Sequence, residues 1–400
     1  MAELGADVAA TTASTGVTEN RAARALFVGA CFLYWMALYL YVPTLSTYAE
    51  SKSPDNLELV GIVIAQYGLW QTLIRIPLGI VADWVGRRKP FILAGIAMAG
   101  LGAFVMGSSG HINGLIAGRA ITGLAAGVWV LLVVGFSSLF PPDLAVQASA
   151  TLNLASSAGR VLATGANGWL NAAGGYSLAF TIATVSAGLA LLTILPFKEQ
   201  AREGRRPSLH GFVRLSMRRD VITPTLLSTV AQYASWATTL GFTPILAKRL
   251  GATDVALSLL VSGNMVVGIL GNLVTAAAIR RIGARRMVVV CFVMMCLGIA
   301  GVAVAPTLGL LFVAQGVQGL FQGAVYPVLL GMSIEHVDER ERSTAMGVHQ
   351  AIYGIGMTAG PALGGVIAEA VGIAPMFLIT AAACLIAGVL GARQLAVSDR

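Results

Sequence analysis

Three arginines lie within long apolar stretches of the sequence, where a charged side chain needs a specific partner. They are Arg75, Arg119 and Arg160. A guanidinium group at the centre of a bilayer costs roughly 2.5–3.5 kcal/mol on insertion scales, so each is expected to face a bundle interior or a water-filled cavity. Arg160 lies on a polar helix face, at spacings of three or four residues, with Asn153, Ser157, Thr164 and Asn167. This face predicts binding of an anionic group, because the guanidinium fork binds carboxylates and phosphates.

No carboxylate is placed to neutralise these arginines. None of the 18 acidic residues lies in the middle of an apolar stretch, although Asp83 and Glu369 lie at the ends of two stretches. The sequence therefore offers no carboxylate in an apolar stretch that could carry protons. His349, near the start of an apolar stretch, can titrate near neutral pH and is the candidate coupling residue. The alternative for His349 is a hydrogen-bonded polar filler of a helix contact.

Amide and aromatic side chains form a second group of candidates. Gln315, Gln318 and Gln322 share one helix face, and Gln232 shares another with two hydroxyl residues, beside Trp236. Rings and amides with few charges suit a pocket for an organic solute, whereas ordinary helix packing by glutamine and tyrosine is the alternative. The candidate substrate-binding residues are Arg160, Arg119, Asn153, Thr164, Tyr34, Tyr41, Gln232, Trp236, Gln315, Gln318 and Gln322.

Metal, cofactor and enzyme chemistry lack the residue patterns they require. The four cysteines all lie in apolar stretches without metal-ligand spacing, at Cys31, Cys291, Cys296 and Cys384. No cluster of His, Asp, Glu, Ser and Cys lies at one depth, so neither an enzyme nor a bound metal or cofactor is expected. The net charge of +8 is spread over short loops, and nucleic acid is therefore not an expected partner.

The composition indicates an all-α integral membrane protein. Of the 400 residues, 56% are hydrophobic and 11% are charged, against about 25% charged in soluble domains. A spanning helix needs about 20 mostly apolar residues, and twelve such stretches can be placed. They cover residues 25–48, 58–82, 90–108, 112–137, 148–171, 176–196, 221–246, 255–279, 287–305, 308–333, 343–369 and 373–393.

The basic residues predict the topology. Of the 26 Lys and Arg residues, three lie within spans, and only Lys52, Lys248 and Arg249 fall in loops on one side of the membrane. The other 20 fall on the opposite side, which the positive-inside rule makes cytoplasmic. We therefore expect cytoplasmic tails at 1–24 and 395–400, six-helix bundles at 25–196 and 221–394, and a cytoplasmic linker at 197–220.

The two halves of the sequence repeat each other at a nearly constant offset. The loop around Gly86 matches the loop around Gly283 at 197 residues, and Gly123 matches Gly319 at 196 residues. A third match joins residues 164–168 to 361–365, again at 197 residues. Two related six-helix halves are one of the known plans of secondary transporters.

These motifs resemble those of the major facilitator superfamily over nearly the whole chain. The sequence Gly79-x3-Asp83-x2-Gly86-Arg87-Arg88-Lys89 is similar to the family's signature loop, and Arg119 with Gly123 and Gly127 resembles its fourth-helix motif. Residues 360–365, in span eleven, are similar to a glycine-proline kink known from span five of proton-linked exporters, from which span five itself departs.

The resemblance implies two pseudo-symmetric six-helix bundles and a gate at the signature loop. The candidate gating residues are Asp83, Gly79, Gly86, Arg87, Arg88 and Arg75. The alternative for the loop is a topology anchor at the inner membrane surface, and Arg75 can also extend towards that surface. For Arg119 the resemblance implies a structural role in the fourth helix as the alternative to substrate binding.

The expected function is secondary active transport of a small organic solute, with an anionic part, by alternating access. A broad-specificity drug efflux exporter is the alternative, favoured by the aromatic first span and disfavoured by the altered fifth span. A membrane-embedded enzyme is the least favoured class. The expected setting is a bacterial inner (plasma) membrane with both termini in the cytoplasm, where a monomer contacts membrane lipid and its small-molecule substrate.

Overall fold

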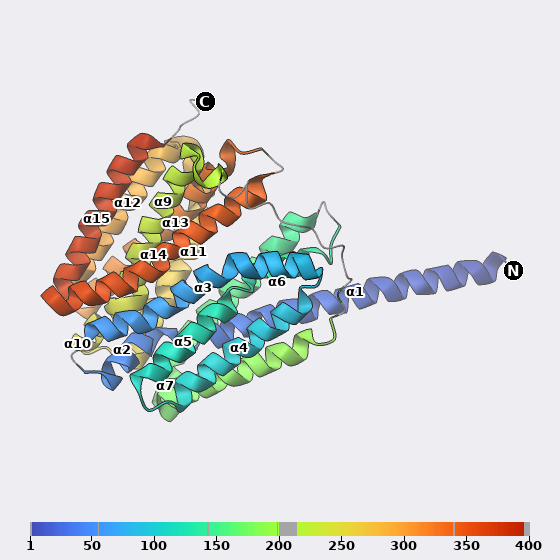
Figure 1. Cartoon of the computed structure of the whole chain (residues 1–400), viewed down its shortest axis with the longest axis horizontal. Coiled ribbons are helices and arrows are strands. Elements are labelled where there is room, and N and C mark those ends of the chain that lie inside the picture. Colours follow the sequence, from blue (N-terminus) through green and yellow to red (C-terminus); the bar gives the residue numbers. More distant parts are fainter. Residues whose placement is uncertain are drawn as a thin grey trace.

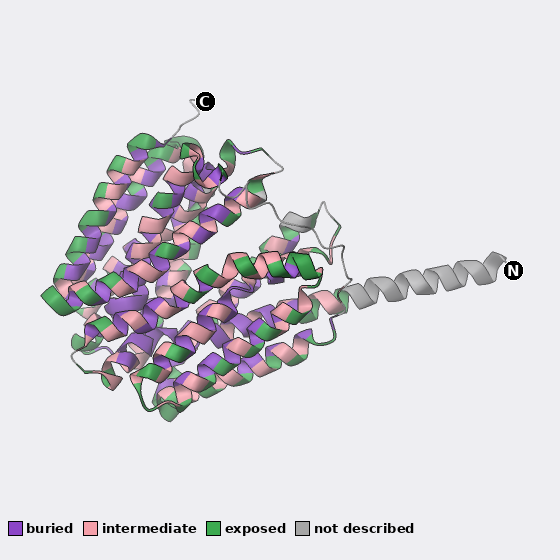
Figure 2. Cartoon of the chain, viewed as in Figure 1, coloured by how far each residue is buried: buried purple, intermediate pink, exposed green. Residues whose placement is uncertain are grey.

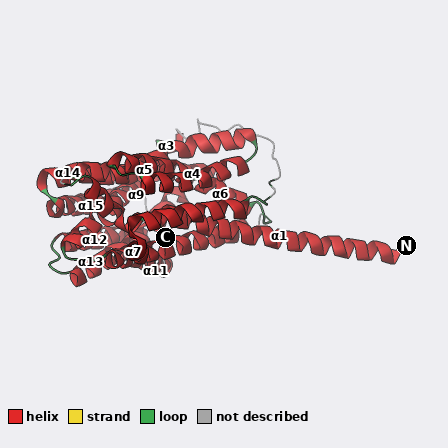
Figure 3. Cartoon of the chain, turned by 90° about the horizontal axis from the view of Figure 1, so that it is seen from below, coloured by secondary structure: helices red, strands yellow, loops and turns green. Residues whose placement is uncertain are grey.

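The computed structural model describes the backbone of residues 2–54, 56–141, 144–197, 199, 214–338 and 341–395, and their side chains apart from residues 2–20, 145, 146, 276 and 343. All regular elements in this described part are helices (Figure 3). The first bundle contains α1 (Ala2–Tyr39), α2 (Val42–Lys52), α3 (Leu57–Val85), α4 (Lys89–Ser108), α5 (Ile112–Ala126), α6 (Trp129–Ser137) and α7 (Ala145–Ile194). The second contains α9 (Arg219–Ala237), the π-helix η2 (Thr238–Phe242), α10 (Thr243–Arg249), α11 (Asp254–Ile282), α12 (Ala284–Ala303), α13 (Leu308–Glu335), α14 (Arg342–Val371) and α15 (Ile373–Gln394).

Each of the twelve predicted spans has a helical counterpart. Among the described residues, ten helical segments are long and apolar enough to cross a membrane. One of them, α7, holds two spans, because Gly174 and Gly175 leave the helical conformation at φ values of −150° and +68°. A further span consists of α9, η2 and α10, which follow one another without a break and whose Ser, Thr and Gln residues lower the hydropathy. The predicted fold class is therefore confirmed.

The most extensive contacts between the two bundles are made by two pairs of helices. The first pair is α3 with α14, and the second is α7 with α11. The bundles lie together at the end that holds α2 and α10, and they diverge towards the end where α3 leads into α4 (Figure 1). We call these the outer end and the inner end. The inner end carries the basic loops that the sequence predicts to be cytoplasmic.

The internal repeat is visible at the inner end. Gly86 ends α3 at φ +68°, and Gly283 ends α11 at φ +81°. A positive φ strains any residue with a Cβ atom, so glycine is the residue that lets each helix stop and turn there. The matching glycines in the two halves of the sequence thus end the corresponding helix in each bundle, both with a positive φ.

Large apolar side chains cover much of the outside of the bundles. Leu73, Phe104, Leu154, Leu162 and Leu192 each expose more than half of their surface. Exposed and partly buried residues alternate along the outer faces of the helices, while buried residues face the bundle interiors (Figure 2). A surface this apolar suits contact with lipid tails rather than water.

Parts of the predicted tails and linker lie outside the described residues. These parts are the side chains of residues 1–20 in the N-terminal tail, residues 198 and 200–213 in the linker, and residues 396–400 at the C-terminus.

Candidate functional site

A cavity of about 730 Å³ lies between the two bundles. Helices α1, α3, α6 and α7 line it from the first bundle, and α9, η2, α11, α13 and α14 line it from the second. Its lining extends from Trp236 near mid-membrane to Arg75, Asn153 and Leu330, which lie towards the inner ends of their helices. The cavity therefore occupies the middle and inner part of the contact between the bundles.

The first bundle gives the cavity an aromatic and cationic wall. Trp35, Tyr39, Tyr67 and Trp129 supply rings, and Arg75 and Arg160 supply guanidinium groups. Among the described residues that line the cavity there is no aspartate or glutamate. The wall therefore carries positive charge without an acidic partner of its own.

Arg160 is half-buried and held by neutral groups. Its Cζ lies 5.0 Å from the ring centre of Trp35 and 5.8 Å from that of Tyr39, within the range of cation–π attraction. Nε donates to the Ser156 carbonyl at 3.3 Å, and Nη2 donates to Ser157 Oγ at 3.3 Å. These rings and oxygens are all neutral, so the Arg160 guanidinium has no ion-pair partner among the described residues. An anionic ligand in the cavity would supply one.

The second bundle gives the cavity a wall of amides and hydroxyls. Gln232, Asn272 and Gln322 line the cavity, and their side chains make no hydrogen bond to another described residue. Asn264 differs, because its Nδ2 already donates to the Gln315 carbonyl at 2.9 Å. Free amides facing a cavity can both donate to and accept from a polar solute.

The polar face of α7 continues past the cavity into a helix contact. Asn153, Ser157 and Arg160 line the cavity, whereas Thr164 and Asn167 are fully buried against α11. The polar face of α7 thus lines the cavity as far as Arg160 and packs against α11 from Thr164 onwards.

Hydrogen bonds between the bundles close the outer end. Thr44 Oγ1 donates to Asn167 Oδ1 at 2.9 Å, and Ser258 Oγ of the second bundle lies 3.4 Å from the same oxygen. Asn171 Nδ2 donates to Thr44 Oγ1 at 2.9 Å and to Asp254 Oδ2 of the second bundle at 3.0 Å. We call these five residues the outer latch.

Charged groups and close backbone contacts reinforce the outer latch. Of the five ion pairs among the described residues, the one between Arg249 and Glu50, at 3.3 Å, joins the two bundles. The backbone N–H of Leu57 also donates to Glu369 Oε2 across the bundles, at 2.6 Å. At Gly168 a Cβ atom would lie 2.3 Å from the Asp254 carbonyl oxygen. The outer end is therefore closed tightly enough to require glycine.

At the inner end, the described ion pairs stay within each bundle. Asp83 pairs with Arg88 at 3.2 Å inside the signature loop. The carboxylate of Glu199 accepts from the backbone N–H groups of Arg88 and Lys89 at 2.7–2.9 Å, at the start of α4. Arg218 pairs with Asp220 in the second bundle. The cavity is thus accessible from the inner end and closed from the outer end.

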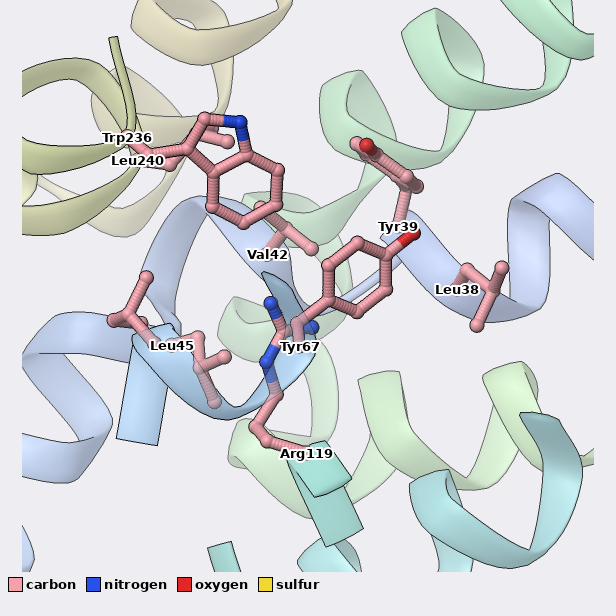
Figure 4. A pocket seen from close by; sticks show the side chains of 9 residues that line it. Leu38, Tyr39, Val42, Leu45, Tyr67, Arg119, Trp236 and Leu240 are labelled. Carbon is pink, nitrogen blue, oxygen red and sulfur yellow. The ribbon is translucent and has the colours of Figure 1, made fainter. Parts of the chain in front are cut away.

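Arg119 lies beyond the outer limit of the cavity, in a buried pocket. It is 2% exposed, and its Nε and Nη1 have no hydrogen-bond partner among the described residues. Its Cζ lies 4.5 Å from the ring centre of Tyr67, which stacks on Trp236 of the second bundle at 5.5 Å. A void of about 10 Å³, lined by all three side chains, adjoins the guanidinium (Figure 4). The Tyr67–Trp236 pair, together with Tyr39 and Leu240, lines both this void and the main cavity and lies between them.

Two of the candidate glutamines lie outside the cavity and fix the seventh span. Gln315 Nε2 donates to Thr239 Oγ1 at 2.8 Å, and Gln318 Nε2 donates to Thr238 Oγ1 at 2.7 Å. Both threonines belong to η2, and both glutamines are buried. A π-helical turn inside an α-helix often marks a functional site, and here α13 holds it in place.

The other sequence candidates are distributed between the cavity and the core. Gln232, Gln322, Trp236, Asn153 and Arg160 line the cavity, as does the gating candidate Arg75. Tyr34 and Tyr41 are buried in the first bundle, where the Tyr34 hydroxyl donates to the Ala125 carbonyl at 2.8 Å. Cavity residues not identified from the sequence include Gln71, Trp129, Asn264, Asn272, Tyr326 and Tyr353. The eight-residue spacing of Asn264 and Asn272 was a signal that could have identified one more polar face.

His349 lies one layer behind the cavity wall. Its Nδ1 is 3.1 Å from Thr225 Oγ1, and its ring contacts Tyr326 and Tyr353, which do line the cavity. Nε2 has no partner among the described residues. The residue is fully buried, which matches the role of a hydrogen-bonded filler between α9 and α14.

Comparison with known proteins gives matches along most of the chain. A family model described as Major Facilitator Superfamily matches residues 27–223 and 225–399. The inner membrane transport protein YajR of Escherichia coli (strain K12) is 37% identical over 103 residues, which cover 25% of this chain and 22% of YajR. The multidrug resistance protein Stp of Mycobacterium tuberculosis (strain CDC 1551 / Oshkosh) is 33% identical over 98 residues, which cover 24% of this chain and 18% of Stp. The chain thus spans about a quarter or less of the length of these curated relatives.

Solved structures match over nearly their whole length. A bacterial homologue of the human lysosomal transporter Spinster, in an inward-facing and occupied conformation, has a TM-score of 0.75 and 14% identity, covering 93% of this chain and 95% of the other. The human organic anion transporter MFSD10 has a TM-score of 0.66 and 16% identity, covering 93% of this chain and 99% of the other. At these identities the likeness concerns the fold.

Proposed function

This chain belongs to the Major Facilitator Superfamily and is a secondary transporter, and from that premise we propose that its cargo is a small organic anion. The observation that carries the proposal is Arg160, a half-buried guanidinium in a cavity of about 730 Å³ whose described lining holds no carboxylate. An anionic group on the substrate would supply the missing charge through short, charge-assisted hydrogen bonds.

The remaining lining indicates an organic cargo with polar groups. Trp35 and Trp129 offer ring faces, and the free amides of Gln232, Asn272 and Gln322 offer hydrogen bonds from the opposite wall. A cavity of this size falls within the range of pockets for small organic molecules, roughly 300–1,000 Å³. The fold is compatible with such a cargo, since MFSD10 is described as an organic anion transporter.

We further propose that the protein lies in a bacterial inner membrane with its inner end towards the cytoplasm. The excess of basic residues at that end supports this orientation. YajR, the relative from Escherichia coli, is named as an inner membrane protein.

Ligand binding to Arg160 variants tests the anion proposal. The purified protein is screened by thermal shift against organic anions, because a ligand that binds the folded state raises its stability. Hydrogen bonds to a charged group contribute roughly 1.5–3 kcal/mol, so Arg160→Gln should weaken binding by about 10- to 150-fold. Arg160→Lys keeps the charge but lacks the planar fork, and it should bind more weakly than wild type and more tightly than Arg160→Gln. Arg285→Gln, at the inner start of α12, is the control for general loss of charge.

The yield of folded protein is measured together with binding, because a structural role and a substrate-binding role for Arg160 predict different yields. If Arg160 has a structural role, both substitutions lower the yield of folded protein. A well-folded Arg160→Gln variant that binds the same anions normally would exclude the proposal. Stabilisation by lipophilic drugs regardless of the residue at 160 would instead support the drug exporter, which the aromatic wall and the relative Stp favour.

A further inference from the structure

The cavity encloses two cationic groups that the described structure does not neutralise. Arg75 and Arg160 both line it, and neither forms an ion pair among the described residues. Arg75 Nη1 is 3.4 Å from the Gln350 carbonyl oxygen, and Arg160 contacts only neutral oxygens and rings. The cavity, at about 730 Å³, has room for water beside both side chains.

Transport requires the inner end to close around this cavity. Closure removes water and brings the amide wall nearer to the arginine wall, while the charges of Arg75 and Arg160 remain. Neutral carbonyls and rings hold a guanidinium group in position but do not cancel its charge, and an uncompensated buried charge is strongly unfavourable. Arg119 is already buried beyond the Tyr67–Trp236 pair and forms no ion pair among the described residues, so closure would add to a charge that the fold encloses already.

We propose that the protein is an obligate anion exchanger, which changes its open side at a useful rate only with an anion bound. The bound anion neutralises the arginine wall and lets the cavity close, whereas the empty carrier remains open to the inner side. Movement of one anion outward is then tied to movement of another inward. This inference rests on the proposed anion cargo and adds to it the mode of coupling: the return step uses a second organic anion in place of an empty carrier.

An internal counter-charge tests the inference directly. Ser157 Oγ lies 3.3 Å from Arg160 Nη2 at the cavity wall, so Ser157→Asp places a carboxylate beside the guanidinium. Ser157→Asn has nearly the same size without the charge and is the matched control. If uncompensated charge holds the empty carrier open to the inner side, Ser157→Asp should let the outer end open more often, and Ser157→Asn should not.

The readout is a cysteine in the outer latch. Ser258 is fully buried there, so Ser258→Cys should react with a membrane-impermeant maleimide only when the outer end opens. The four native cysteines are replaced by alanine, and labelling rates are measured in one zwitterionic buffer without added substrate. We expect labelling about tenfold or more faster in Ser157→Asp than in Ser157→Asn, because an uncompensated charge slows closure by at least this factor. The neutral double variant Arg75→Gln/Arg160→Gln should also label faster than wild type.

The outcomes separate this inference from the anion proposal. Equal labelling in Ser157→Asp and Ser157→Asn, with the double variant no faster than wild type, would overturn obligate exchange. If the wild-type protein still binds organic anions in the thermal-shift screen, the proposed cargo survives that result. If no anion binds and the labelling rates are also equal, both proposals are excluded. Should Ser157→Asp fail to fold, the double variant decides the question alone.

Discussion

Gly168 is the position at which one added methyl group should shift the balance between the two open states. It lies on α7 where α11 of the second bundle crosses most closely. A Cβ atom there would lie 2.3 Å from the Asp254 carbonyl oxygen, 2.4 Å from Val255 Cα and 2.5 Å from the Asp254 carbonyl carbon. All three atoms are backbone, so no flexible side chain can move aside. Gly168→Ala therefore forces the two helices apart at the outer latch.

The size of the shift follows from the contact. Overpacking by one methyl group costs about 1–3 kcal/mol, and here the cost applies only while the outer end is closed. A penalty of about 2 kcal/mol changes the ratio of the two states by about 30-fold. Alanine also stabilises an α-helix by up to about 1 kcal/mol relative to glycine. That gain is the same in both states and cancels in the ratio, so folded yield should not fall.

Two reporter cysteines measure the shift in a cysteine-free background. Ser258→Cys reports opening of the outer latch, and Asn272→Cys reports access to the cavity from the inner end. With Gly168→Ala, labelling at 258 should become faster and labelling at 272 slower. Gly165→Ala is the matched control on the same helix, since its Cβ would meet only Ser262, at 3.9 Å. Unchanged labelling at both reporters, or the same shift from Gly165→Ala, would refute the reasoning.

Three other outcomes concern the inner loops and the topology. Asp83→Asn removes the ion pair with Arg88 and should lower transport more than it lowers folded protein, because the loop is expected to favour one conformation; unchanged transport and unchanged cavity labelling would exclude the gate role. Gly86→Ala should lower the free energy of unfolding by about 1–2 kcal/mol, since Gly86 has φ +68°. Gly79→Ala should leave the free energy of unfolding unchanged, because a Cβ atom at residue 79 meets nothing within 4 Å. Equal melting temperatures of the two variants would contradict this. Reporter fusions should place Lys248 outside and the 197–220 linker in the cytoplasm, and a linker reached only from outside would reverse the topology.

Sequence periodicity predicted the spans and one side of the cavity. Apolar length alone located most helix ends to within a few residues, because a bilayer sets the minimum span; the exception is α1, which begins at Ala2 and not at residue 25. The three- and four-residue spacing around Arg160 correctly placed Asn153 and Ser157 on the same cavity-lining face as Arg160. What that face meets was not predictable, since the change from cavity to helix contact near Thr164 depends on where α11 of the other bundle approaches.

The glutamines of α13 also show that a helix face can be predicted from the sequence while the element that it contacts cannot. Gln315, Gln318 and Gln322 do share a face, but only Gln322 reaches the cavity. The other two meet Thr239 and Thr238, whose position depends on the π-helical turn of the seventh span. No local pattern in residues 219–249 announces that turn. Residues that contact a distant irregular element are therefore the ones that sequence reasoning misplaces.

The same π-helical turn sets the angle around the helix axis between the cavity-facing residues of the seventh span and the residues that form ion pairs at its outer end. Below it, Gln232 and Trp236 face the cavity; above it, Lys248 and Arg249 pair with Asp254 and Glu50. Each residue of an α-helix advances about 100° around the axis, so removing one residue at η2 would rotate the upper surface by roughly that angle relative to the lower one. The transporter depends on both surfaces at once. Deleting one residue here should therefore turn the cavity face and the outer ion pairs of this span out of register by about a quarter turn, which a substitution at the same position would not do.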